Sequence, residues 1–121
     1  MPANELDVAV RTKDGIAIMD LTGELDSSAE AALEAGYEEA TGSGARSIVL
    51  NFAATDYINS TGIALIVGLL AQARSRGVEV KAYGLSDHYR EIFEVTRLAD
   101  FMTILDSETS ALGGAEGDDH A

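Results

Sequence analysis

The sequence predicts an α/β fold in which a mixed β-sheet of about five strands is flanked by four helices. Three observations favour it. A turn signal, Lys13-Asp14-Gly15, separates two apolar segments near the N-terminus, as in a β-hairpin. Short apolar runs then alternate with longer segments of helical pattern, which is typical of βα units. The length of 121 residues fits one domain. The expected order is β-β-α-β-α-β-α-β, with a short helical turn at the end.

The two strands of the hairpin come first. Leu6, Val8 and Val10 alternate with polar or small residues, which indicates a half-buried strand. Residues 16–21 form a largely apolar return strand, and residues 22–25 end it. Strands joined by a tight turn pair antiparallel, so the hairpin accounts for the mixed character of the sheet.

A helix and a buried strand follow the hairpin. Residues 26–28 offer N-cap side chains, and residues 29–40 are rich in Ala and Glu, which favour helix. Gly42 and Gly44 end this helix. Residues 47–52 are a short apolar run, which is typical of a strand covered on both faces.

Residues 53–58 are expected to form a loop that leads into a second helix at residues 61–76. Asn59 and Ser60 provide its cap signal, and Gly77 ends it. Its apolar residues recur with the helical period of 3.6. Four of them are therefore expected on the inner face: Ile63, Ile66, Val67 and Leu70.

The rest of the chain repeats this pattern. A strand is expected at residues 78–83, a helix at 88–96, a strand at 102–105 and a helical turn at 108–112. Residues 86–87 cap the helix at 88–96, and its inner face is expected to carry Tyr89, Ile92 and Phe93. The tail, residues 113–121, is Gly-rich and acidic and is predicted to be disordered. The folded domain is therefore expected to span residues 1–112.

Charge and composition limit the possible functions. The formal net charge of −13 argues against binding to DNA, RNA or an anionic membrane, whose phosphates are held by Lys and Arg. It is consistent with a basic protein partner or simply with a solvated acidic surface. The chain has no cysteine, which excludes disulfides and thiolate metal sites. Residues 1–7 are polar and the longest apolar run, residues 63–71, is too short to cross a bilayer, so a cytoplasmic location is expected.

No enzyme motif is present. The phosphate-binding patterns G-x-x-x-x-G-K-[ST] and G-x-G-x-x-G are absent, and Ser60 lies in Ile-Asn-Ser-Thr-Gly rather than in a nucleophile elbow. His88 opens a predicted helix and His120 lies in the tail, and both are interpreted as surface residues rather than metal ligands or a base for a serine. The chain is expected to be a non-enzymatic protein with no metal and no cofactor.

The segment from Asp56 to Gly62 is the candidate site. It joins a buried strand to an amphipathic helix, and such turns lie at the carboxyl edge of the sheet, where α/β proteins place their sites. With Asn59 as the N-cap, Ser60 occupies the first helical position, where free N–H groups and the helix dipole favour an anion. Gly62 lowers helix stability and leaves backbone bare, which predicts close approach by another molecule. The simpler interpretation is an ordinary capped helix start.

Four features together resemble the STAS domain family, in particular bacterial anti-sigma factor antagonists. They are Leu-Thr-Gly-Glu-Leu-Asp at residues 21–26, Ser-Ile-Val-Leu-Asn-Phe at 47–52, the segment 56–62, which is similar to the family's Asp-Ser-Ser/Thr-Gly, and the helix 63–76 followed by a glycine turn. The resemblance covers residues 6–105 and implies a STAS fold. Asn59 stands where the family has an aspartate.

The resemblance implies a function in partner switching. It implies that Ser60, next to Thr61, is phosphorylated by a serine kinase that is also the anti-sigma factor. The unphosphorylated antagonist would bind this kinase and free a sigma factor, phosphorylation would break the complex, and a PP2C-type phosphatase would reset it. The implied partner-binding residues are Asp26, Asn59, Ser60, Thr61, Gly62 and Ile63. The chain itself is expected to be a monomer or a weak dimer.

Two alternatives remain open at this point. The chain could be a STAS scaffold or ligand-binding module that is not phosphorylated and regulates another target. It could also be a receiver-like protein that accepts phosphate on Asp56. Receivers need an acidic cluster after the first strand and a lysine after the last strand, and no lysine follows Lys81.

Overall fold

The computed structural model describes residues 5–113. The strands are β1 (Asp7–Lys13), β2 (Ile16–Leu25), β3 (Ser47–Asn51), β4 (Thr55–Ile58), β5 (Glu79–Tyr83) and β6 (Thr103–Leu105). The helices are α1 (Glu30–Gly42), α2 (Ser60–Ser75), α3 (Asp87–Val95) and α4 (Glu108–Ala111), with 3₁₀ turns η1 (Ser27–Ala29) and η2 (Leu98–Asp100). The predicted disorder of the tail concerns residues that, after Gly113, lie outside the described range.

The sheet is mixed, as predicted. Its order is β1-β2-β3-β5-β6, and only the β1–β2 pair is antiparallel. The β1–β2 hairpin closes through Asp14 and Gly15, both with positive φ (54° and 80°), as a two-residue turn requires. The right-handed twist of paired strands favours this turn, and Asp-Gly is one of the few dipeptides that adopt it readily.

The sheet has six strands, because residues 53–58, which were predicted to form a loop, contain β4. This strand pairs in parallel with the far end of β2, at Gly23–Leu25, beyond the stretch that pairs with β3. Only Ile58 of its four residues is buried, so it has neither an apolar run nor a clean alternation. Its strand structure depends on the unusual length of β2, which leaves backbone groups free for a second partner.

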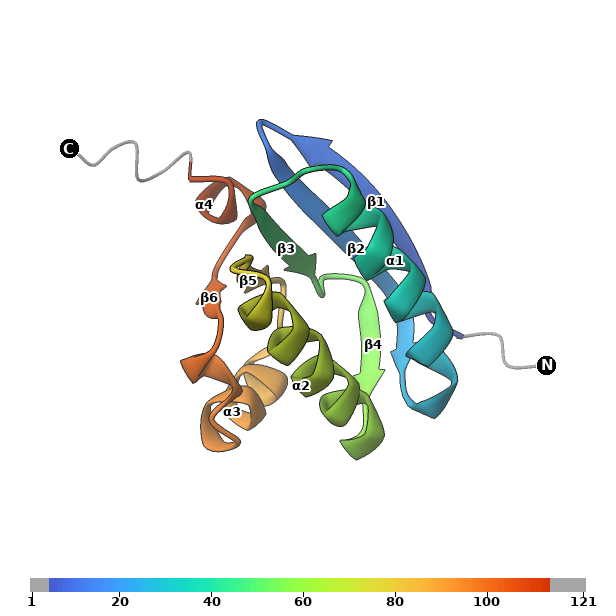
Figure 1. Cartoon of the computed structure of the whole chain (residues 1–121). Coiled ribbons are helices and arrows are strands. Elements are labelled where there is room, and N and C mark those ends of the chain that lie inside the picture. The colour runs from blue at the N-terminus through green and yellow to red at the C-terminus, as the bar shows by residue number, and fades with distance from the viewer. Residues whose placement is uncertain (1–4, 114–121) are drawn as a thin grey trace.

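Three helices cover one face of the sheet and α4 lies on the other. In Figure 1, α1 lies along β1 and β2, and α2 lies beside it in the same layer. The main core lies under these helices and includes Met19, Leu50, Ile66 and Phe93. The opposite face has a smaller apolar cluster in which Ile18, Val49 and Tyr83 pack against Ala111 of α4.

The inner face of α2 differs from the prediction at Val67. Its side chain is 47% exposed, whereas the neighbouring Leu69 is buried together with Ile66 and Leu70. A period of 3.6 allows several apolar stripes on a helix that is apolar almost all round, and only the position of the sheet selects one. Within residues 5–113, the structure contains no helix with the length and apolar character needed to cross a membrane.

Candidate functional site

The turn between β4 and α2 is built around Asn59. This residue has an extended backbone, and its side-chain oxygen accepts a hydrogen bond from the Gly62 N–H at 2.9 Å. Its backbone N–H donates to the Leu25 carbonyl at 3.2 Å, which ties the start of α2 to the end of β2. The predicted N-cap is confirmed, and the turn lies at the carboxyl edge of the parallel β2–β4 pair.

Ser60 is the first residue of α2 and is exposed, as is Thr61 after it. None of the hydrogen bonds within the described residues involves the side chain of Ser60. The cap is supplied by Asn59, so the Ser60 hydroxyl has no structural task at this helix start. It lies in the positive end of the helix dipole, where added negative charge is favourable. Ile63, one turn further, is half-buried against the core.

Gly62 has a different role from the one predicted. It is buried, and a Cβ on it would lie 2.8 Å from the Leu25 carbonyl carbon and closer still to its oxygen. The close approach predicted at this glycine is therefore made by the chain's own β2 strand. The expectation of bare backbone facing another molecule is wrong, because the contact that excludes a side chain lies inside the domain.

Asp26 lies beside this turn because β2 and β4 end together. Leu25 pairs with Ile58, so Asp26 and Asn59 each follow a paired residue at the same sheet edge. Asp26 caps η1 and accepts hydrogen bonds from the Ser28 hydroxyl at 2.6 Å and the Ser28 N–H at 2.9 Å. Both hydrogen bonds lower the pKa of the Asp26 carboxyl, and the one from the Ser28 hydroxyl has the larger effect. The structure thus brings Asp26 to the same edge as the segment 59–63.

Aromatic residues surround the turn, and the sequence reasoning missed their role. Tyr57 is 48% exposed on β4, two residues before the cap. The Tyr89 hydroxyl of α3 accepts a hydrogen bond from the Ile58 N–H at 3.1 Å, and the exposed His88 lies edge-on to the Tyr89 ring at 4.9 Å. An aromatic residue inside a predicted polar loop was the available signal for Tyr57.

The acidic residue of the candidate segment lies apart from other possible metal ligands. Asp56 is exposed on β4. Across the part of the chain that the structure describes, no three His, Cys, Asp or Glu residues come together as a group that could hold a metal ion. What the turn offers is an exposed hydroxyl, an exposed aromatic ring and a helix start in a fixed position. Such a surface is suited to recognition by a protein.

Comparison with known proteins yields consistent matches. The STAS domain family matches residues 7–111. An anti-sigma-B factor antagonist of Staphylococcus aureus strain NCTC 8325 is 31% identical over 99 residues, which cover 82% of this chain and 92% of that protein.

Solved structures match in fold. The crystal structure of an anti-sigma factor antagonist from Mycobacterium paratuberculosis has a TM-score of 0.72 at 20% identity, covering 90% of this chain and 92% of that one. The Bacillus cell fate determinant SpoIIAA in its phosphorylated form has a TM-score of 0.66 at 22% identity, covering 87% of this chain and 96% of that one. At these identities the likeness concerns the fold, and it agrees with a mixed sheet and four helices.

Proposed function

Because the chain belongs to the STAS domain family, we propose that it is an anti-sigma factor antagonist whose binding to an anti-sigma factor kinase is controlled by phosphorylation of Ser60. The unphosphorylated protein binds the kinase and withholds it from a sigma factor. The phosphorylated protein releases it, and a PP2C-type phosphatase removes the phosphate. The proposal places these proteins together in the cytoplasm.

One observation supports Ser60 as the phosphorylated residue. Its hydroxyl is exposed at the first position of a 16-residue helix, on a turn that Asn59 already caps. A kinase can therefore reach the hydroxyl, and esterifying it removes no hydrogen bond that the fold uses. The relative SpoIIAA has been solved in a phosphorylated form, which supports a phosphate on this fold.

Phosphorylation is expected to act locally. The buried Gly62 against Leu25 and the Asn59 cap hold the first turn of α2 in place, so a phosphate need not move it. The phosphate adds about 1.5 to 2 negative charges at pH 7. A charge of this size that is buried without a partner in a protein interface is strongly unfavourable, and the complex with the kinase is therefore weakened.

Asn59 makes the charge around Ser60 different from that in relatives with an aspartate at this position. Asparagine and aspartate cap helices about equally well, but the amide does not repel a phosphate on the next residue. Asp26, at the same edge, is already engaged by Ser28. The phosphorylated form should therefore be tolerated by the fold at least as well as in a relative with a carboxylate cap.

The test is to incubate the protein with ATP and the anti-sigma factor kinase of the same organism and to measure intact mass and affinity. We expect one acid-stable phosphate on the wild type and none on Ser60→Ala, with Thr61→Ala as the matched control that still accepts one. Ser60→Ala should bind the kinase as tightly as the unphosphorylated wild type, and Ser60→Asp more weakly. Equal kinase affinities for wild type, Ser60→Ala and Ser60→Asp, or an acid-labile phosphate, would contradict the proposal.

A further inference from the structure

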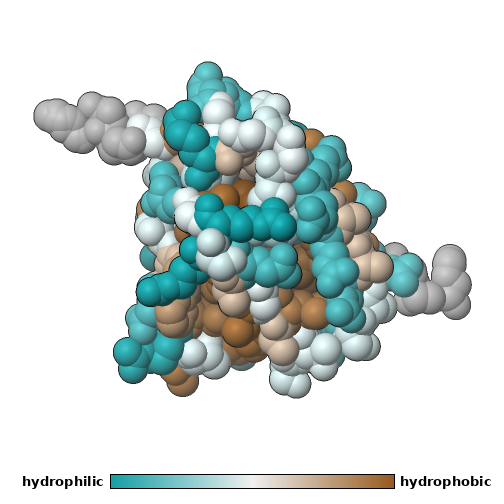
Figure 2. Space-filling view, in the orientation of Figure 1, coloured by the Kyte–Doolittle hydropathy of each residue, from teal (hydrophilic) through white to brown (hydrophobic). Residues whose placement is uncertain are grey.

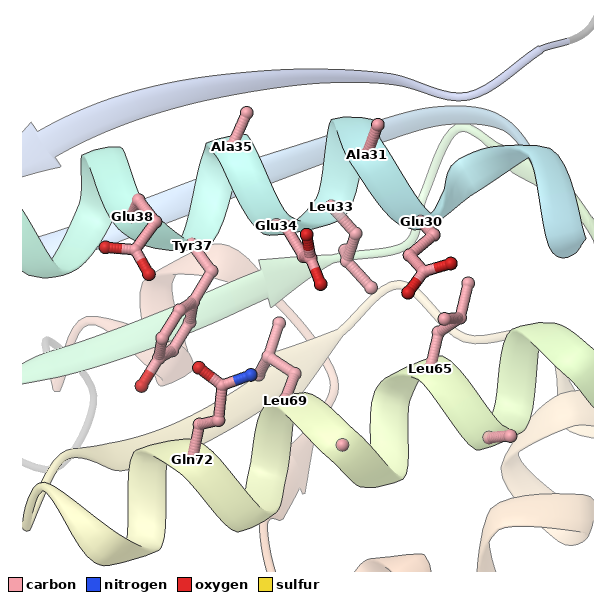
Figure 3. Close-up of a pocket in the computed structure, with 12 residues that line it drawn as sticks. Glu30, Ala31, Leu33, Glu34, Ala35, Tyr37, Glu38, Leu65, Leu69 and Gln72 are labelled. Atoms are coloured by element: carbon pink, nitrogen blue, oxygen red, sulfur yellow. The ribbon is translucent and has the colours of Figure 1, made fainter.

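A groove of about 630 Å³ separates α1 from α2. Figure 3 shows the two helices side by side, with their residue numbers rising in the same direction. In Figure 2, hydrophobic surface gathers over the middle of the face that carries these helices, with hydrophilic side chains on its borders. The helices contact each other little, so the groove lies open along the helical layer.

The α1 side of the groove is acidic. Glu30, Glu34 and Glu38 follow one another at four-residue spacing, so they share one side of the helix. Like charges at this spacing repel each other and destabilise the helix. Glu38 lies 4.0 Å from Arg76, whereas within the described residues Glu30 and Glu34 have no ion pair. The row extends along about 12 Å of helix, and its first two members, Glu30 and Glu34, present uncompensated negative charge.

The α2 residues that line the groove are uncharged, and two of them, Ala64 and Gly68, are small. Ala64, Gly68 and Gln72 line it, and Ser60 lies one turn before Ala64 on the same side. A Cβ placed on Gly68 would have no atom within 4 Å, so the packing of the domain does not require glycine there. Glycine in a helix interior is unfavourable relative to alanine. Gly68 therefore keeps space on the surface that nothing in the domain fills.

The floor of the groove contains a polar group without a partner. Leu33, Leu65 and Leu69 make it apolar, and Tyr37 crosses from α1 toward α2 near Gln72 (Figure 3). Tyr37 is only 2% exposed, and its buried hydroxyl makes no hydrogen bond. Burial is also the main cause that raises the pKa of Tyr37. A buried hydroxyl in this state is unfavourable, and a ligand that supplies an acceptor relieves it.

We propose that this groove binds a basic amphipathic helix of the same kinase that acts on Ser60, an inference that rests on the proposed function. Apolar side chains of that helix pack on Leu33, Leu65 and Leu69, where the small residues of α2 allow close approach. Its Lys or Arg side chains meet the glutamate row, and an acceptor group reaches Tyr37. A second copy of this chain is a poor occupant, because its net charge is −13.

The position of the groove connects it to Ser60. A helix lying along Gly68 and Ala64 reaches Ser60 at the next turn, just beyond the residues that line the groove. The groove then selects the partner by charge and shape, and Ser60 controls whether the bound helix can extend to the start of α2. Two separable parts of one interface therefore carry specificity and regulation.

Gly68→Leu tests the proposal by filling the groove. Gly42→Leu is the matched control, since Gly42 ends α1 on the exposed surface and also has no atom within 4 Å of an added Cβ. By calorimetry with the purified kinase, Gly68→Leu should bind at least tenfold more weakly than wild type, and Gly42→Leu equally well. Thermal unfolding should show that both variants are as stable as wild type.

Charge reversal gives an independent test. Glu34→Lys should weaken kinase binding at least fivefold at low salt, whereas Glu39→Lys, on the same helix but outside the groove, should change it less than twofold. Tyr37→Phe should weaken binding by a smaller factor without loss of stability. Weaker self-association of Gly68→Leu, with unchanged kinase binding, would identify a second copy as the occupant and overturn the proposal.

The outcomes separate this inference from the proposed function. If Gly68→Leu and Glu34→Lys bind the kinase like wild type while Ser60→Asp does not, the groove is not the docking site and the switch at Ser60 stands. If the unphosphorylated wild type does not bind the kinase at all, the proposed function fails and the groove inference fails with it. Weakening by both groove variants alone, with both controls unchanged, supports it.

Discussion

Helix α2 contains two glycines with opposite surroundings, Gly62 in its first turn and Gly68 in its middle, which faces the groove. Gly62 has no room for a side chain, because the Leu25 carbonyl lies against it. Gly68, less than two turns later, has empty space where a side chain would be. Glycine has a low intrinsic helix propensity, so neither residue is there to stabilise α2. The two positions differ in their neighbours. The first turn of α2 is held in place by contact with β2, whereas the middle of α2 has no such contact at Gly68.

This difference bears on function. A locked first turn holds Ser60 at a constant position, so a chemical change on its hydroxyl is read directly by a partner. A free middle can change its surface without changing the domain, and partner preference can therefore vary there at little cost in stability. The following predictions test whether the two parts are as different as their surroundings indicate.

The largest effect is expected from Gly62→Ala. The added methyl group must push Leu25 away, which disturbs the β2 end and the turn that Asn59 caps. Overpacking against backbone should lower the free energy of unfolding by about 3 kcal/mol, measured by urea denaturation. A loss below about 0.5 kcal/mol, the size of an ordinary surface substitution, would show that the first turn is not locked.

Asn59→Ala should have the next largest effect. It removes the side-chain acceptor for the Gly62 N–H and should cost about 1 kcal/mol of unfolding free energy. Asn59→Asp is the control: it keeps a cap and should keep the stability. If Asn59→Ala is as stable as Asn59→Asp, the cap does not contribute to the position of Ser60.

Gly68→Ala should act in the opposite direction. Alanine fits the helix better and meets no atom, so the free energy of unfolding should rise by about 0.5–1 kcal/mol. The same denaturation experiment compares it directly with Gly62→Ala. A loss of stability in Gly68→Ala would mean that the groove is closed in solution, and that Gly68 is as closely packed as Gly62.

The smallest effect is expected on the far face of the sheet, away from both parts of α2. There Arg11 pairs with Asp20 at 2.6 Å and with Glu108 of α4 at 3.0 Å. Hydrogen bonds from Arg11 are the largest cause that lowers the pKa of both carboxyls. Lowered pKa values in the folded state mean that these pairs stabilise the protein above the unfolded pKa of each acid and lose this effect as the pH falls.

Arg11→Gln tests this network. At pH 7 it should lower the free energy of unfolding by only about 0.5–1 kcal/mol, because the ion pairs are partly exposed to solvent. At pH 3 wild type and variant should differ less, because the carboxyls are then mostly protonated in the unfolded state and part of the stabilisation from their lowered pKa values is lost. Kinase affinity should be unchanged in Arg11→Gln. A variant that loses equal stability at both pH values would show that Arg11 contributes through packing rather than charge.

Features that depend on near neighbours in the chain could be predicted from the sequence. The hairpin turn at Asp14-Gly15, the caps at Asn59 and Ser86 and the position of Ser60 at the helix start all follow from local backbone preferences. The mixed sheet with four helices followed from the alternation of short apolar runs with helical patterns. These inferences needed no knowledge of which segments meet in space.

The sequence by itself therefore determined the order of the main elements, the helix start that exposes Ser60 and the acidic character of the surface. Only the tertiary structure decided that β4 pairs with the end of β2, that Val67 faces outward and that Gly62 lies against Leu25. It also decided that the Tyr37 hydroxyl is buried between two helices without a hydrogen-bond partner. The physical reason is that each of these features depends on contacts between segments far apart in sequence, which local sequence patterns cannot predict.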